Sequence, residues 1–350
     1  MGLKLKALAG AAVLALGVAA AEACTRVVYL GPEGRIITAR SMDWRMDIGT
    51  NLWVLPRGVE RNGETGDNTH RWTARYGSVV ATAYDIASAD GLNEAGLSAN
   101  LLWLAVAEYP EWDGSGAPGL AISLWAQYML DNFATVAEAV EDARRGGYVV
   151  VSDSMPGEDR LATLHLSLSD ATGDSAIFEH VGGELVIHHS RDYQVMTNEP
   201  TFDQQLALAE YWREIGGTVM LPGTNRAADR FARASFYVNA IPQTEDRREA
   251  TASMFGVIRN VSVPYGITTE DQPNISSTRW RTVVDHKDRL YYFESALSPN
   301  VFWVDLKEID FAEGSGARAL MLGPDQARTF SGEVSGQFEP AAAFTFLGLH

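Results

Sequence analysis

Cysteine is almost absent from this 350-residue chain, which has a single one at position 24. A single cysteine excludes a disulfide within the chain. Positive charge is also scarce, because 28 Lys and Arg stand against 45 Asp and Glu, a formal net charge of −17. Nucleic acids and anionic membrane surfaces are bound through clustered positive charge, so this balance predicts neither as a partner.

Familiar metal-site and serine-hydrolase motifs are missing as well. The 7 histidines have no metal-ligand spacing, and the sequence contains no H-E-x-x-H and no G-x-S-x-G. We therefore expect neither a metal nor an organic cofactor. The sequence also contains no evident linker, repeat or low-complexity tract, which favours one domain after the leader described next.

The first 23 residues have the order of a secretory signal peptide. Two lysines give a positive start, residues 7–20 are all apolar or Gly, and Ala21-Glu22-Ala23 forms a small-x-small cleavage site. The apolar run is too short for a comfortable membrane span, which needs about 20 residues. We expect residues 1–23 to be removed, residues 24–350 to form a single domain, and the mature protein to be periplasmic or secreted.

Cys24 directly follows the predicted cleavage site, and three interpretations of it are open. It could be a small buried apolar residue. It could be acylated after processing and anchor a binding protein to a membrane, although Glu22 fits such a signal poorly. Finally, cleavage after Ala23 would expose a thiol nucleophile and an α-amine with a pKa of about 8 on one residue, which supplies nucleophile and base together. The position favours the last interpretation without excluding the others.

Hydrophobic patterning predicts several hairpins interleaved with pairs of helices. Such an order is typical of a layered α+β domain, with sheets packed together and helices outside. The predicted strands are 24–30, 35–42, 51–56, 77–84, 96–104, 148–153, 163–170, 175–181, 184–190, 279–286, 289–295 and 300–306, and the predicted helices are 120–133, 134–145, 202–214, 225–240 and 244–260.

The segments C-T-R-V-V-Y-L (24–30) and I-T-A-R-S-M-D-W (37–44) resemble the start of the choloylglycine hydrolase family, which contains bile salt hydrolases and penicillin V acylases. The resemblance extends to about Arg230. It implies an N-terminal nucleophile hydrolase with an αββα four-layer sandwich, which cleaves a linear amide in a small-molecule substrate with Cys24 and without a cofactor. Family members form tetramers, but the interval from Asn198 to Arg230 is shorter than in the Gram-positive enzymes, so a homo-oligomer is a weaker expectation here.

The resemblance also assigns roles in A-R-S-M-D. Arg40 would help to hold the thiolate, since a guanidinium favours thiolate over thiol. Asp43 would accept a hydrogen bond from the α-amine of Cys24. In a regular strand these two side chains would point to opposite faces, so a bend or bulge near Asp43 is expected if both face Cys24.

Three later motifs follow in the family's order. A-D-G-L-N-E-A-G-L (89–97) is interpreted as a turn joining two strands, and it sets the register to Trp103, whose backbone N–H would bind the oxyanion where relatives have Asn or Tyr. M-T-N-E-P (196–200) gives Asn198 as a side-chain donor to that oxyanion. L-P-G…D-R-F (221–231) gives Arg230 as a second active-site arginine.

Three aromatic residues, Trp44, Tyr84 and Trp103, lie close to these positions in sequence. They could be core residues. If they line the pocket instead, flat rings suit a phenoxy ring or a slim acyl chain better than a four-ring steroid. The leader, the lack of a disulfide and Trp103 in place of Asn resemble the Gram-negative branch of the family. We therefore expect penicillin V acylase-like or acyl-homoserine lactone acylase activity, with conjugated bile salt hydrolysis as the alternative and acyl transfer to an amine as a weaker one.

Overall fold

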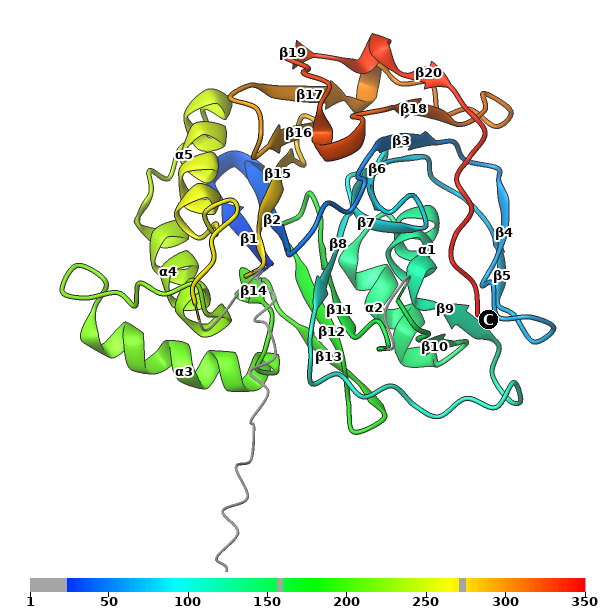
Figure 1. Ribbon diagram of the computed structural model, residues 1–350, viewed down its shortest axis with the longest axis horizontal. Coiled ribbons are helices and arrows are strands. Elements are labelled where there is room, and N and C mark those ends of the chain that lie inside the picture. Colours follow the sequence, from blue (N-terminus) through cyan, green and yellow to red (C-terminus); the bar gives the residue numbers. More distant parts are fainter. Residues whose placement is uncertain (1–23, 156–159, 271–274, 350) are drawn as a thin grey trace, which may run out of the picture.

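A computed structural model describes residues 24–155, 160–270 and 275–349 of the chain (Figure 1). The predicted signal peptide, residues 1–23, lies outside the described residues. The first of two large sheets has the order β14-β1-β2-β15-β16-β17-β19. Its strands are β1 (Thr25–Leu30), β2 (Ile36–Trp44), β14 (Val195–Thr197), β15 (Ser277–Asp285), β16 (Leu290–Ser295), β17 (Val301–Asp305) and β19 (Gly332–Glu333).

The second large sheet has the order β13-β12-β11-β8-β7-β6-β3-β18-β20. Its strands are β3 (Leu52–Leu55), β6 (Ser78–Ala83), β7 (Ala87–Asn93), β8 (Ser98–Trp103), β11 (Leu164–Ser169), β12 (Ser175–Val181), β13 (Glu184–His189), β18 (Arg318–Leu320) and β20 (Glu339–Pro340). Two short pairs complete the described strands: β4 (Glu60–Asn62) with β5 (Arg71–Thr73), and β9 (Gly119–Ala121) with β10 (Val149–Val151).

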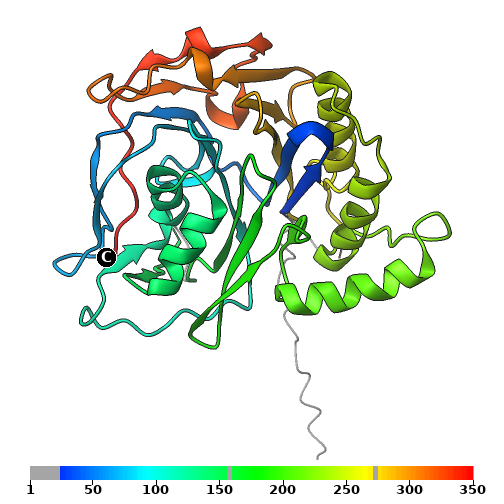
Figure 2. The same cartoon turned by 180° about the vertical axis from the view of Figure 1, so that it is seen from behind.

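Helices cover the outer faces of both sheets (Figure 2). α4 (Ala227–Ala240) and α5 (Arg247–Asn260) pack on β1, β2 and β15, and α3 (Phe202–Ile215) packs against α4. α1 (Trp125–Asn132) packs on β7 and β8, and α2 (Val136–Arg145) contacts β12. The short 3₁₀ helices are η1 (Pro32–Gly34), η2 (Ile122–Leu124), η3 (Leu306–Glu308), η4 (Pro324–Gln326) and η5 (Ser335–Gln337). These four layers confirm the predicted αββα sandwich.

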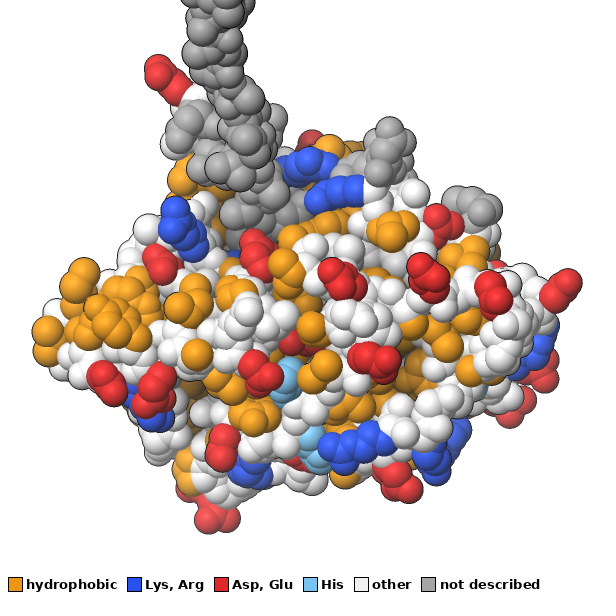
Figure 3. Space-filling view, turned by 90° about the horizontal axis from the view of Figure 1, so that it is seen from below, with side chains coloured by type: hydrophobic (Ala, Val, Ile, Leu, Met, Phe, Trp, Pro, Cys, Tyr) orange, Lys and Arg blue, Asp and Glu red, His pale blue; other side chains and the backbone are white. Residues whose placement is uncertain are grey.

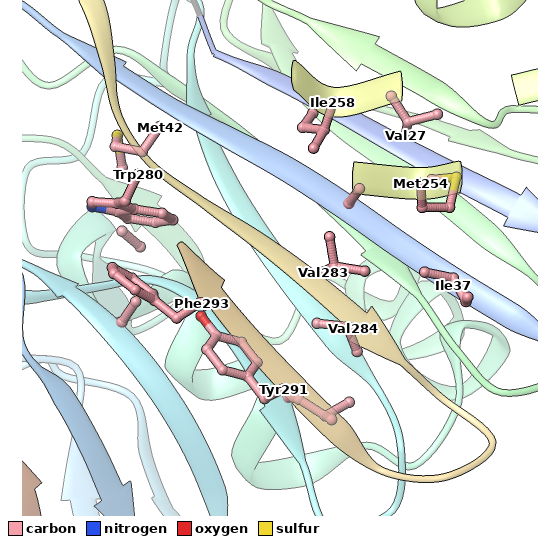
Figure 4. Close-up of a cluster of buried hydrophobic side chains, with 14 of the residues drawn as sticks. Val27, Ile37, Met42, Met254, Ile258, Trp280, Val283, Val284, Tyr291 and Phe293 are labelled. Carbon is pink, nitrogen blue, oxygen red and sulfur yellow. The ribbon is translucent and has the colours of Figure 1, made fainter. Parts of the chain in front are cut away.

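Strand β2 is buried along its whole length, because helices cover one face of its sheet and the second sheet covers the other. Alternation along the strands separates the two faces. Val27 and Val283 occupy the helix side, together with Met254 and Ile258 of α5, whereas Trp280 lies on the opposite side of the sheet (Figure 4). Apolar and β-branched residues such as Ile36, Ile37, Val283 and Val284 mark these strands in the sequence, although polar residues interrupt both β2 and β15.

Two predictions about local structure were wrong. Asp90, Gly91 and Asn93 belong to strand β7, and the chain turns only at residues 94–97. The helix predicted over 120–133 begins at Trp125, after β9 and η2. The missed strands other than β7 are two or three residues long, too short for a hydrophobic period to appear.

Large apolar side chains are exposed on α3 and on the loop that follows it. Leu208, Tyr211, Val219 and Met220 are 45, 61, 79 and 58% exposed, and Figure 3 shows apolar side chains gathered on one end of this face of the molecule. This loop lies between Asn198 and Arg230, the interval whose short length made a homo-oligomer a weaker expectation. Oligomerisation stays a prediction. Among the described residues, no helix is long and apolar enough to cross a membrane.

Candidate active site

The side chain of Cys24 lies just before β1, between the two sheets, and is only 2% exposed. Its Sγ lies 3.5 Å from the backbone N–H of Asp43, which donates to it, and 3.8 Å from Sδ of Met42. Burial raises the pKa of the Cys24 thiol, and the positive charge of Arg40 opposes that shift. The thiol therefore keeps its proton at neutral pH, so any attack by this sulfur needs a base.

Arg40 on β2 reaches across the space between the sheets. Its Nη2 donates to the carbonyl of Leu101 on β8 at 2.7 Å and lies 3.6 Å from Sδ of Met42, the same sulfur that Cys24 contacts. Its guanidinium stacks 4.8 Å from the ring centre of Trp280. The side chain is fully buried, so its charge acts on Cys24 through a medium of low polarity.

Asp90 is the buried partner of Arg40, with the carboxylate 3.7 Å from Nη1. It also accepts hydrogen bonds from Tyr291 at 2.6 Å and from Asn100 at 2.7 Å. Burial raises the pKa of Asp90, and the charge of Arg40 opposes the rise. Sequence reasoning missed this residue because Asp-Gly is a typical turn pair; the apolar Leu92 that continues the strand was the available signal.

Asp43 is held at a strand irregularity. The pairing of β2 with β15 shifts register between Thr278 and Trp280, so the extra residue lies on β15 and not on β2. β2 keeps its alternation: the Asp43 carboxylate lies on the helix side with Ser41 and Arg230, whereas Arg40 points to the second sheet, and the bend expected to bring both side chains to one face is not found. The carboxylate accepts hydrogen bonds from the hydroxyls of Ser41, at 3.1 Å, and of Thr278. Burial raises the pKa of Asp43 to about 6, although Arg230, at 4.0 Å, and the hydroxyl donors act in the opposite direction.

Arg230 connects helix α4 to the start of the first strand. Its Nη1 donates to the carbonyl of Cys24 at 2.6 Å and to the hydroxyl of Thr25, and its Nη2 donates to Oδ1 of Asn198 at 2.9 Å. Because that oxygen accepts from Arg230, the other end of the amide, Nδ2, is the group that faces Trp103. Arg230 therefore fixes both the backbone of Cys24 and the orientation of the Asn198 amide.

Trp103 ends strand β8 next to Asn198. The N–H of Leu104 donates to the carbonyl of Thr163 at 2.9 Å, and pairing alternates along an antiparallel strand, so the N–H and C=O of Trp103 face the other side. On that side the neighbouring strand is β7, which pairs with β8 only from Ser98 to Asn100 and so does not reach Trp103. The carbonyl of Trp103 accepts from Nδ2 of Asn198 at 2.7 Å. The two predicted oxyanion donors thus lie side by side.

An apolar pocket opens beside Cys24. Cys24, Arg40, Trp44, Tyr84 and Trp103 line it among the predicted residues. Residues that the sequence did not single out complete the wall, mainly apolar ones: Met42, Ile48, Ala83, Ile86, Ala87, Ala89, Leu101, Ala121, Ile122, Ser123, Val151, Asp153, Ser154, Met155, Ala162, Leu164, Leu347, Gly348 and Leu349. No sequence signal linked these distant segments to the site.

The structure divides the predicted residues into two groups. The rings of Trp44 and Trp103 pack at 5.7 Å, and Nε1 of Trp44 donates to the hydroxyl of Tyr84 at 3.0 Å, so the three aromatics form one wall of the pocket. Asp43, Asn198 and Arg230 are fully buried and do not line the pocket. They contact Cys24 or Trp103 from within the protein.

The side chains around Cys24 are mainly two arginines, an aspartate, an amide and aromatic rings. Among the described residues, no group of three or more His, Cys, Asp or Glu side chains is placed to hold an ion. The chemistry that these residues can perform is attack by a buried thiol on a carbonyl carbon, with amide and backbone N–H groups close by to bind the carbonyl oxygen.

Comparison with known proteins agrees with this geometry. Residues 24–317 match the model of the family described as linear amide C–N hydrolases, choloylglycine hydrolase family. The chain is 55% identical to penicillin V acylase of Pectobacterium atrosepticum, over 96% of this chain and 95% of that protein. It is 24% identical to a bile salt hydrolase/transferase of Bifidobacterium longum, over 79% of this chain and 93% of that protein.

Solved structures give the same result. A penicillin V acylase from Agrobacterium tumefaciens has a TM-score of 0.88 at 60% identity, covering 93% of this chain and 100% of that one. A conjugated bile acid hydrolase from Clostridium perfringens, with a TM-score of 0.72 at 21% identity, covers 85% of this chain and 97% of that one and shares the fold. The chain belongs to the choloylglycine hydrolase family and is a linear amide C–N hydrolase.

Proposed function

We propose that Cys24, freed as the first residue by removal of residues 1–23 on export, is the nucleophile of a penicillin V acylase. The observation that carries this proposal is the position of the only cysteine, whose sulfur lines an apolar pocket beside Arg40 and Asp43. Acylation of this sulfur by a lipid anchor fits poorly, because the side chain is 2% exposed between two sheets. Membership of a family of amide hydrolases likewise argues against a binding protein.

The proposed reaction uses one residue as nucleophile and base. Cys24 Sγ bonds to the carbonyl carbon while its proton passes to the α-amine of the same residue. The resulting oxyanion receives hydrogen bonds from the N–H of Trp103 and from Nδ2 of Asn198. The C–N bond then breaks as the leaving nitrogen takes the proton from the ammonium, and a thioester remains. Water adds to the thioester while its proton passes to the α-amine, the C–S bond breaks as the sulfur takes that proton from the ammonium, and the acid leaves.

The side chains around Cys24 would support this cycle in different ways. Arg40 and Arg230 place positive charge where negative charge develops on the sulfur. Asp43, whose Thr278 and Ser41 partners fix its carboxylate, would orient the α-amine. The buried surroundings strengthen each of these interactions relative to water.

Asn198→Ala is expected to lower kcat about 10²- to 10³-fold with little change in KM, because the lost N–H acts on the oxyanion and not on the bound substrate. Steady-state kinetics on penicillin V measure both constants. Asn198→Asp is the matched variant: it keeps an oxygen for Arg230 to bind but has no N–H. An unchanged kcat in both variants, with a changed KM, would remove Asn198 from the proposed oxyanion site.

The proposed substrates are phenoxyacetyl amides, as in penicillin V, and long-chain acyl-homoserine lactones. Two penicillin V acylases at 55 and 60% identity support the first class. The apolar lining and the wall formed by Trp44, Tyr84 and Trp103 suit an aryl ring or a slim chain, which both gain from apolar burial. Conjugated bile salts are the alternative substrates, since the bile salt hydrolases among the relatives are 24% identical.

Side-by-side kcat/KM values on penicillin V, a long-chain acyl-homoserine lactone and glycocholate test this choice. We expect the first two to exceed glycocholate at least about tenfold, since the loss of about 1.4 kcal/mol of binding at a poorly fitted steroid corresponds to that factor. A value for glycocholate equal to the others would overturn the argument from the pocket wall and leave the Cys24 mechanism in place.

A further inference from the structure

The last described residues of the chain form an extended strap, residues 341–349. After β20 the strap runs along the side of the molecule, past β3 and the β4–β5 pair, and ends close to β9 (Figure 1, red). It contains no helix or strand. Nevertheless, it is held along its length, first by the N–H of Ala341, which donates to the carbonyl of Ala317 at 3.1 Å.

Aromatic contacts fix the middle of the strap. Phe344 packs edge-on against Trp53 of β3 with ring centres 5.3 Å apart, and Phe346 packs against Phe344 at 4.6 Å. Phe346 is 8% exposed, and the guanidinium of Arg61 lies 5.5 Å from its ring centre. Buried aromatic contacts of this kind make a segment without secondary structure a fixed part of the fold.

Hydrogen bonds to three separate segments of the chain then position Leu347 and Leu349. Leu347 donates to the carbonyl of Ile86 at 2.9 Å and accepts from the hydroxyl of Ser123 at 2.7 Å. Leu349 donates to the carbonyl of Glu64 at 3.0 Å. At Gly348 a side chain would meet the same carbonyl, since an added Cβ would lie 2.8 Å from it. These contacts therefore fix both the path of the strap and how closely it approaches the residues beneath it.

This tripeptide lines the same pocket as Cys24. Neither leucine side chain contributes a polar group, and the reaction proposed above uses neither. The leaving groups of the proposed substrates carry a carboxylate or a lactone, whereas the acyl groups are apolar. Among the residues that the structure describes, the hydrogen bonds of the tripeptide go to Ile86, Ser123 and Glu64 and not to the residues that contact the sulfur of Cys24. An apolar wall held in this way has one chemical use, which is to cover the part of an acyl group that extends away from the scissile bond.

We propose that Leu347 and Leu349 form the distal wall of the acyl site and set the enzyme's preference for aryl and longer acyl groups over short ones. The inference rests on the proposed function, in which the pocket beside Cys24 holds the acyl group. An acyl group that is long enough to reach the two leucines is bound more tightly, in proportion to the apolar area that they cover. Acetyl and butanoyl groups end before the wall and gain nothing from it.

The test is the acyl-length dependence of kcat/KM for a p-nitroanilide series with acetyl, butanoyl, octanoyl and phenoxyacetyl groups, so that the leaving group stays constant. In the double variant Leu347→Ala/Leu349→Ala we expect kcat/KM for the octanoyl and phenoxyacetyl substrates to fall at least about tenfold. The acetyl and butanoyl values stay within about twofold of wild type. Leu347→Met/Leu349→Met, which keeps apolar volume, is expected to restore the preference.

Leu208→Ala is the matched control, since Leu208 lies on α3, is 45% exposed and does not line the pocket. A loss that is equal at all acyl lengths, or no loss at all, overturns the proposal. So does a preference that Met fails to restore. If the double alanine variant does not fold, the double methionine variant and the single variants carry the same comparison. Hydrolysis at the wild-type rate by the Cys24→Ala variant would instead refute the proposed function. Failure of the proposal about the leucines and failure of the proposed function are therefore distinguishable.

Discussion

Replacing Cys24 with alanine is expected to abolish amide hydrolysis, with kcat on penicillin V at least about a thousandfold below wild type. The variant removes the only thiol of the chain, while the groups that would bind the oxyanion, Trp103 and Asn198, keep their places. An intact oxyanion site alone supports only a small remainder of the rate. The measurement is turnover of penicillin V by the purified variant.

Folding must be shown to be intact for this result to be interpreted. Within the described part of the chain, the sulfur of Cys24 contacts Sδ of Met42 and the backbone of Asp43, so the alanine variant should retain the wild-type circular dichroism spectrum and lose little stability. Alkylation of the wild type offers a second route, because one modified site per chain can be verified by mass. Residual turnover above about a thousandth of wild type would contradict the assignment of the nucleophile.

A protein that retains one residue before Cys24 is expected to lose activity by a similar factor, about a thousandfold. In that protein the nitrogen of Cys24 is an amide, which is not a base near neutral pH. Burial raises the pKa of the thiol, so the sulfur does not lose its proton without a base. The comparison is between chains that begin at Ala23 and at Cys24, assayed on the same substrate after their masses have been measured.

The control for this prediction is to restore activity by removing the extra residues. An extension that ends in a protease site directly before Cys24 should leave the protein inactive until cleavage, and activity should appear in step with the newly freed N-terminus. Full activity of the uncleaved protein would require a base other than the α-amine. Asp43, whose pKa burial raises to about 6, would then be the group to examine, with Asp43→Asn as the variant.

Much of the fold was predictable because its longer strands carry β-branched and aromatic residues and are bounded by turn residues. β2 and β15 are covered on both faces, and α4 and α5 have one apolar side, so period and length identified each of them. Local rules of this kind depend only on neighbouring residues, which the sequence displays directly.

The parts that sequence reasoning missed depend on contacts between distant segments. The Asp-Gly pair at position 90 looks like a turn, yet tertiary contacts with Arg40 and Tyr291 keep it in a central strand. The strap residues Leu347 and Leu349 have no period and no motif, and only the folded chain brings them to the pocket. Neither contact leaves a trace in the local sequence.

The chain of contacts from α4 through Arg230 and Asn198 to the carbonyl of Trp103 crosses from a helix layer to the second sheet. Arg40 makes a second crossing, from β2 to the carbonyl of Leu101. The spacing between layers is therefore set locally by two arginines and an amide, whose hydrogen bonds tolerate changes of only a few tenths of an ångström. Loosening of the sandwich would thus disturb the site before either sheet loses a strand, and inactivation under mild denaturant would precede the loss of secondary structure.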